Sequence, residues 1–121
     1  MRCFLLCLAL AAAGVKAQEK AEPISVHVKE VHREQDDGTE KGNWLHITAI
    51  VESKTIIYSL KCDQFYSSET QTYAVQCFDL SAGRDYSARK FQSAIAFWPE
   101  GTKSSPGHLF AAYNITSEKE K

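Results

Sequence analysis

Two cysteines, Cys62 and Cys77, are the only ones beyond the first seven residues of the chain. Such a pair can form a disulfide, bind a metal or act in redox chemistry. A zinc site needs four convergent ligands, and no CxxC motif or histidine-spaced partner lies nearby. A redox pair is usually closer in sequence and adjacent to a helix N-terminus. We therefore predict a disulfide, which is the normal state of two cysteines in a small secreted domain.

The histidines are the next candidates, as metal ligands. His27 and His46 both lie in segments where polar and apolar residues alternate, and both are expected on outward faces that could meet across paired strands. A metal site there would need a further ligand such as Glu30 or Glu52. Solvated strand histidines are much commoner than such sites. We therefore predict no metal and no cofactor.

The nucleophiles and carboxylates give no catalytic pattern. No Gly-x-Ser-x-Gly elbow and no glycine-rich phosphate cradle occur. The carboxylates Asp36, Asp37 and Glu40 surround Gly38 without the spacing of a calcium loop, so they predict a solvated acidic turn. Small catalytic domains generally show at least one recognisable constellation. The protein is therefore not expected to be an enzyme.

The N-terminus has the pattern of a cleaved signal peptide. Arg2 precedes an apolar run, residues 3–15, and the small residue Ala17 closes residues 1–17. The run is shorter than the about 20 residues that span a bilayer, so we predict no membrane span. Cleavage after Ala17 would leave a polar, flexible leader, residues 18–23. The predicted location is extracellular, after secretion.

Length and charge limit the rest of the chain to a modest set of functions. Lys and Arg number 14 against 15 Asp and Glu, without a basic cluster, which argues against a nucleic-acid partner. The length suits one core. We predict one domain over residues 24–116, a mobile charged tail over 117–121, and a monomer.

These residues are positioned by short alternating segments. Apolar residues recur at every second position in the segments around Val26, Ile47, Leu60 and Ile115, and no helical period appears. A solvated loop is expected from Arg33 to Asn43. Seven short strands separated by turn signals predict an all-β fold: an antiparallel, immunoglobulin-like β-sandwich, or alternatively a small β-barrel.

Two stretches resemble known families. Residues 80–86, LSAGRDY, resemble the Leu-x-x-Gly-x-x-Tyr stretch of fibronectin type III and related immunoglobulin-like domains. The resemblance implies that Leu80 is a core residue, that Gly83 belongs to a structural corner, and that the Tyr86 hydroxyl bonds a nearby backbone group there. Residues 42–44, GNW, resemble the Gly-x-Trp of lipocalins, which would imply a barrel with a ligand cavity.

One modification site is present in the last alternating segment. Asn114, Ile115 and Thr116 form an acceptor for N-glycosylation in a secreted chain. Asn114 is out of phase with Tyr113, so its side chain is expected to face outward. We predict that Asn114 is glycosylated.

Apolar side chains on outward faces give the strongest indication of function. Trp44 and Ile50 share a face with His46, and Phe65 is out of phase with Cys62. Exposed apolar patches usually mark contact surfaces. We therefore predict a binding surface at Trp44 and His46, beside Asp36 and Asp37. The predicted function is a secreted protein that binds another extracellular protein, as an effector, a venom or saliva component, or an immune modulator. A small carrier of lipophilic ligands is the alternative, and an enzyme ranks third.

Overall fold

The computed structural model of the chain describes residues 21–98 and 110–121. These residues form seven β-strands, and none of them lies in an α-helix. The strands are β1 (Glu22–Gln35), β2 (Gly42–Glu52), β3 (Ile56–Ser67), β4 (Thr72–Val75), β5 (Asp85–Lys90), β6 (Ala94–Phe97) and β7 (Tyr113–Glu120). The predicted all-β class is confirmed.

Six of these strands close into an antiparallel barrel. The order around it is β1, β2, β3, β7, β6, β5, and β5 pairs with β1 to complete the ring. The barrel closes because β1 is long enough to pair with β5 along residues 22–27 and with β2 along residues 27–35. The structure thus fits the small-barrel alternative. The predicted sandwich is not confirmed, because the described strands form one continuous sheet and not two facing sheets.

The barrel interior is filled by apolar side chains. Alternation along the strands turns every second side chain inward. The buried residues are Val26, Val28, Ile47, Ala49, Val51, Tyr58, Leu60, Cys62, Cys77, Leu80, Ala88, Ile95, Phe97 and Tyr113. A barrel of about eight strands has an interior just wide enough to be filled by side chains or to hold one small ligand. The six-stranded ring here is narrower, and its core is occupied by these side chains.

The predicted loop from Arg33 to Asn43 is shorter than expected. β1 continues to Gln35 because it pairs with β2 as far as Leu45, and the loop itself is residues 36–41. A β-bulge between Val28 and Glu30 shifts the register and reverses the alternation, so that the next core contact is made by Val31. The polar residues of this half of β1 then lie on a solvated face, which an antiparallel sheet accommodates.

Both ends of the predicted domain also need correction. The segment expected to be a mobile tail, residues 117–121, is mostly strand, since β7 extends to Glu120 and pairs with β3 along residues 56–59. Backbone pairing holds it there although its side chains are charged. At the other end, β1 begins at Glu22, inside the predicted leader. The predicted signal peptide and its cleavage site lie outside the described residues.

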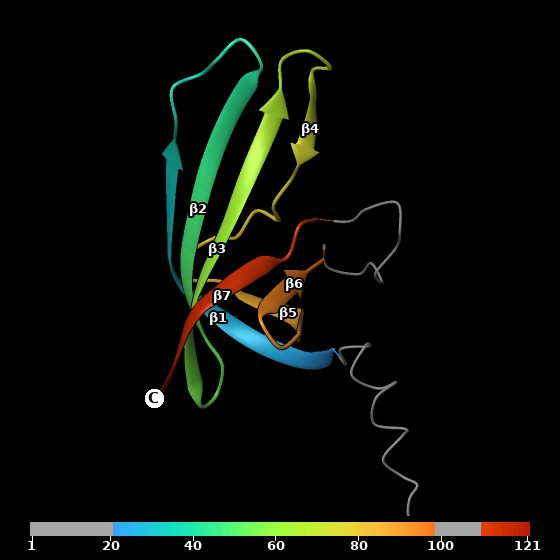
Figure 1. The fold of residues 1–121 in the computed structure, drawn as a ribbon. Helices are drawn as coiled ribbons and strands as arrows, with labels where there is room; N and C mark the ends of the chain where they lie inside the picture. The colour runs from blue at the N-terminus through green and yellow to red at the C-terminus, as the bar shows by residue number, and fades with distance from the viewer. Residues whose placement is uncertain (1–20, 99–109) are drawn as a thin grey trace, which may run out of the picture.

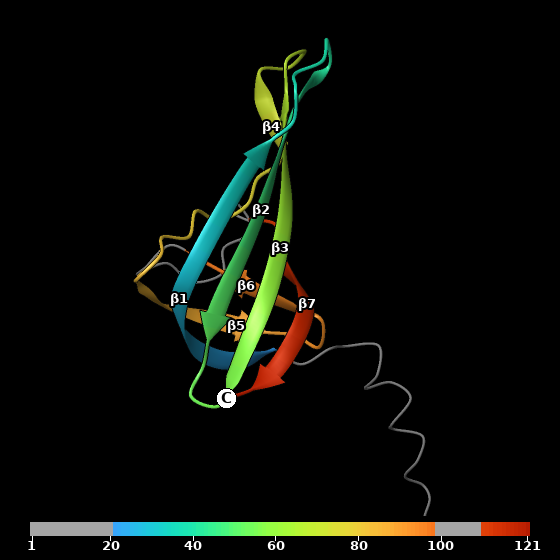
Figure 2. The ribbon, with the colours of Figure 1, turned by 90° about the vertical axis from the view of Figure 1, so that its left-hand side faces the viewer.

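Part of the sheet extends beyond the barrel. The end of β1, the start of β2, the end of β3 and β4 continue past the other strands as a projection, which we call the arm (residues 31–46 and 63–75) (Figures 1 and 2). The arm forms because β3 pairs with β7 along its first half and with β4 along its second half. The two faces of the arm therefore carry opposite sets of side chains.

A crossing segment, residues 76–84, leads from β4 back across the barrel end next to the arm. The disulfide between Cys62 and Cys77 ties it to β3, as predicted. The Tyr113 hydroxyl donates a hydrogen bond to the Phe78 carbonyl at 2.6 Å, and Leu80 is fully buried. The segment therefore closes this end of the barrel core.

The disulfide does not join opposite positions of the hairpin that β3 and β4 form. Tyr66 does lie opposite Tyr73, but a register shift places Phe65 opposite Val75. The strand then ends, and Cys77 forms an isolated bridge with Ala111 instead. The disulfide thus joins the crossing segment to the barrel.

Candidate functional site

The outer face of the arm carries an aromatic pair. Strand alternation turns Trp44 and Phe65 away from the core, and the register of β2 and β3 places them opposite each other, with ring centroids 4.8 Å apart. Trp44 is 42% exposed. The Asp36 backbone N–H donates to the Trp44 carbonyl at 3.0 Å, which holds the start of the 36–41 loop beside the ring.

His46 lies next to this pair and is held between two carboxylates. Its Nδ1 is 2.7 Å from Asp63 on β3, and its Nε2 is 2.9 Å from Asp36. The hydrogen bond to Asp63 is the main cause that raises the pKa of His46 above its ordinary 6.5, and the bond to Asp36 adds to it, against a smaller opposing effect of desolvation. The protonated ring is therefore favoured, with both nitrogens donating.

The aromatic rings at this position have a fixed geometry. The Trp44 ring is stacked on the His46 ring at an interplanar angle of 2°, with centroids 6.3 Å apart. Phe65 supports Trp44 from the neighbouring strand. We call this group the Trp44 site: Trp44, Phe65, His46, Asp36 and Asp63. It presents the exposed Trp44 ring, flanked by the half-buried rings of His46 and Phe65, next to carboxylates.

The chemistry of the site suits binding better than catalysis. A general base needs a ring nitrogen that can accept a proton from a nucleophile, and both nitrogens of His46 are engaged. They also point at different carboxylates, whereas a metal site needs ligands that converge. Within the described residues, no cluster of three or more histidine, cysteine or acidic side chains is arranged to hold a metal ion.

The two strand histidines considered as metal ligands do not meet. In the sheet His27 lies opposite Glu52, and its ring is bonded to Asp85 at 2.7 Å. His46 lies opposite Glu34, several residues further along the same pair of strands. The bulge and the length of β1 separate the two rings.

The structure brings together most of the predicted binding residues. Trp44, His46 and Asp36 are in contact, whereas Asp37 is exposed in the loop and makes no side-chain hydrogen bond within the described residues. Asp63 was not predicted as a site residue from the sequence. A signal for it existed, because the short turn at 53–55 places Glu52 opposite Ile57 and the same register then places Asp63 opposite His46.

The remaining predicted residues lie elsewhere. The Tyr86 hydroxyl accepts a hydrogen bond from the Ser81 backbone N–H at 2.9 Å, beside the buried Leu80, and Gly83 has a positive φ of 86° in the turn between them. This is the kind of contact that the resemblance implies, here at the junction of the crossing segment and β5. Asn114 is exposed on β7, opposite Lys61 of β3.

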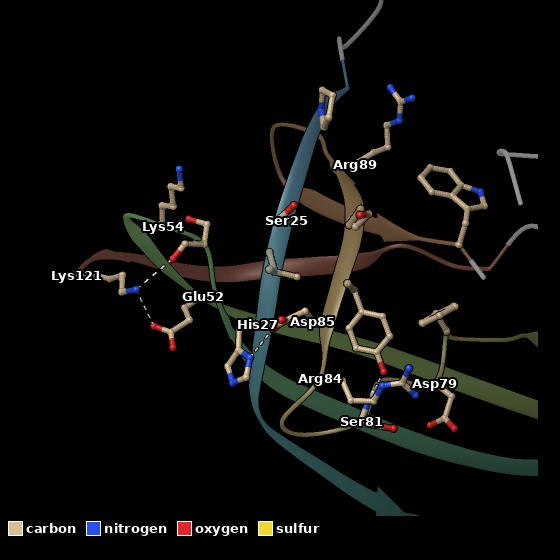
Figure 3. A pocket seen from close by; sticks show the side chains of 18 residues that line it. Ser25, His27, Glu52, Lys54, Asp79, Ser81, Arg84, Asp85, Arg89 and Lys121 are labelled. Atoms are coloured by element: carbon tan, nitrogen blue, oxygen red, sulfur yellow. Dashed lines mark hydrogen bonds and ion pairs between the residues drawn. The ribbon is translucent and has the colours of Figure 1, made fainter. Parts of the chain in front are cut away.

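Two surface depressions lie outside the barrel core. The larger, of about 1130 Å³, is broad and open over β1 and β5 (Figure 3). Its charged side chains are of both signs and partly paired with each other, as are His27 with Asp85 and Lys121 with Glu52. The smaller, of about 320 Å³, lies at the arm beside Leu45, Tyr66 and Tyr73. Neither has the enclosed apolar form typical of a small-molecule site.

Comparison with known protein families, with curated proteins and with solved structures finds no match to this chain. Within the part of the chain that the structure describes, no helix has the length and apolar character needed to cross a membrane. The disulfide is compatible with an extracellular protein.

Proposed function

We propose that this chain is a secreted, non-enzymatic protein that binds another extracellular protein through the Trp44 site. The observation that carries the proposal is Trp44, which is 42% exposed yet fixed by its contacts with His46 and Phe65. Tryptophan is enriched at interface hot spots. A ring that is already ordered loses little side-chain entropy when a partner covers it.

The extracellular part of the proposal rests on three features. Residues 1–17 have the pattern of a signal peptide, and the disulfide suits an oxidising compartment. Asn114 belongs to a glycosylation motif and is exposed. We propose that Asn114 carries a glycan, which would project from β7 and leave the arm accessible.

The carrier alternative has weaker support. A carrier needs an enclosed apolar cavity on the order of 300 Å³ or more, and side chains such as Tyr113 and Leu60 occupy the barrel interior here. The smaller depression reaches that volume, but it is open to solvent at the arm. A filled core with an exposed aromatic face is typical of a protein-binding module.

The test is a comparison of two alanine variants in partner capture. Trp44→Ala should weaken binding of the partner by about 1 kcal/mol or more, because it removes the proposed central contact. The partner is captured from the extracellular fluid in which the protein occurs. Tyr73→Ala is the matched control, since Tyr73 is similarly exposed, at 47%, but belongs to the opposite face of the arm. Bound protein is quantified by mass spectrometry after capture on the immobilised full chain.

Melting temperatures of both variants complete the experiment. Trp44→Ala should melt within a few degrees of the parent, because the ring is not part of the buried core. An equal loss of capture in Tyr73→Ala would contradict the proposal, as would a large loss of stability in Trp44→Ala. The second result would assign Trp44 a structural role in the arm.

A further inference from the structure

Several carboxylate oxygens in and beside the Trp44 site have no hydrogen-bond partner within the described residues. One oxygen each of Asp36 and Asp63 is bonded to His46, and the second oxygen of each makes no hydrogen bond within the described residues. Glu34, which lies opposite His46 on β1, makes neither a hydrogen bond nor an ion pair there. Three side chains thus offer acceptor oxygens on one face, next to the exposed ring of Trp44.

The neighbourhood of the site has an excess of negative charge. The loop at the tip adds Asp37 and Glu40 to the three carboxylates, and both are exposed. Lys41 and Lys61 are the basic side chains closest along the loop and β3, and neither forms an ion pair within the described residues. His46 contributes a positive charge that its own two carboxylates already offset. A cationic group would therefore be attracted to this face.

The rings narrow the choice of cation. The faces of Trp44 and Phe65 attract a cation by their quadrupole, and tryptophan is the best of the aromatic side chains for this contact. A guanidinium is planar, so it can stack on a ring while its edge donates two parallel hydrogen bonds to a carboxylate. An ammonium can lie over a ring and donate to a carboxylate, but it is a point charge and neither stacks flat on the ring nor donates a parallel pair of hydrogen bonds. Arginine is the side chain that fits an aromatic surface bordered by carboxylates.

We infer that the Trp44 site accepts an arginine side chain from a basic segment of the partner protein. The guanidinium stacks on Trp44 and donates hydrogen bonds to Glu34 or to the second oxygen of Asp36. This inference rests on the proposed function and specifies its partner. It also explains why an exposed tryptophan stands in an acidic surrounding, where a purely apolar partner would have to desolvate several carboxylates.

The test uses a defined peptide, because the partner is unidentified. The probe is the acetylated and amidated pentapeptide Gly-Arg-Gly-Arg-Gly, and its counterpart has citrulline in place of arginine, with the same shape and no charge. The readout is the NMR shift of the Trp44 indole N–H in the full chain, assigned with Trp44→Phe. The arginine peptide should give a saturable shift, and the citrulline peptide should bind at least about fivefold more weakly. Added salt should weaken binding of the arginine peptide, because it screens the charges.

Three variants locate the contact. Glu34→Gln and Asp36→Asn should each weaken binding of the arginine peptide several-fold, because each removes a negative charge beside Trp44. Glu34 has no partner to lose, so that variant keeps the fold intact. Asp85→Asn is the matched control, because Asp85 is also bonded to a histidine but lies on β5, outside the arm, where it pairs with His27. Equal binding of the citrulline peptide, no indole shift, or an equal loss in Asp85→Asn would overturn the inference.

The two proposals fail in different ways. If partner capture depends on Trp44 but the arginine peptide gives no shift, the site binds a protein through other chemistry and only the inference fails. If capture does not depend on Trp44, the proposed function fails, whatever the peptide does.

Discussion

The imidazole of His46 joins two separate parts of the chain to β2. It connects Asp63 on β3 with Asp36 at the start of the 36–41 loop. A neutral imidazole has a single N–H and can donate to only one of them. The second carboxylate would then face a lone pair, so the side-chain link between the loop and β3 depends on the charge of His46, beside the backbone hydrogen bond that ties Asp36 to Trp44.

The stability of the protein should therefore depend on pH through His46. The pKa of His46 is raised above 6.5 in the folded protein, so its contribution is present in full below about pH 6.5 and is lost as the pH rises through the raised pKa. The groups that face the ring are Asp36, Asp63 and Glu34, with Lys61 diagonal to it. The difference in melting temperature between the parent and His46→Gln should shrink as the pH rises above 6.5 and through the raised pKa. A difference that stays constant over this range would show that the ring acts without its charge.

At the scale of elements, β2 and β3 were predictable and the ends of β1 and β7 were not. Alternating apolar residues define β2, and the short turn that follows it fixes the register that pairs Trp44 with Phe65. The charged end of β7 has no such pattern and was therefore not predictable as a strand. Backbone hydrogen bonds with β3 hold it in the sheet, whatever its side chains are. The barrel closure was also hidden, since alternation reveals which face of a strand is buried but not which edges meet.

The crossing segment depends on its disulfide. Cys62 and Cys77 are both buried and lie 15 positions apart in the sequence. In the chain-entropy model a loop of this size contributes about 3 kcal/mol to stability. Replacing both cysteines with alanine should lower the free energy of unfolding by about 2–4 kcal/mol, measured by urea denaturation. Reducing the parent protein should lower it by a similar amount, and unchanged stability in both experiments would mean that side-chain packing alone holds the segment.

At the scale of the whole molecule, the barrel is closed by its last strand. β7 joins β3 to β6 and so completes the ring. The end of the chain is anchored as well: the Lys121 backbone N–H donates to the Thr55 carbonyl at 2.9 Å, and its ammonium lies 3.0 Å from Glu52. That ammonium lowers the pKa of Glu52 by its hydrogen bond.

Removing residues 117–121 should consequently destabilise the barrel, although Asn114 and Ile115 still pair with β3, and Tyr113 and Asn114 with β6. The truncation exposes the β3 edge along residues 56–59 and the core beneath it. We expect a loss of several kcal/mol, a large part of the 5–15 kcal/mol that is usual for a domain, seen as a lower and broader thermal transition by circular dichroism. Deletion of Lys121 alone is the control and should have a much smaller effect, because it leaves the strand pairing in place. Similar stability of the two truncated proteins would mean that residues 117–120 do not support the ring.

The position of β7 also bears on the order of events during synthesis. β1, β2 and β3 are neighbours in sequence and can pair while the chain is still being made. The free edge of β3 must then wait for a strand that is translated on the order of several seconds later, at ordinary elongation rates. Until Tyr113 and the residues after it emerge, the nascent sheet keeps an open edge and an uncovered apolar face. Closure of the barrel therefore has to wait until β7 has been made, and chaperones that shield strand edges would have their effect in that interval.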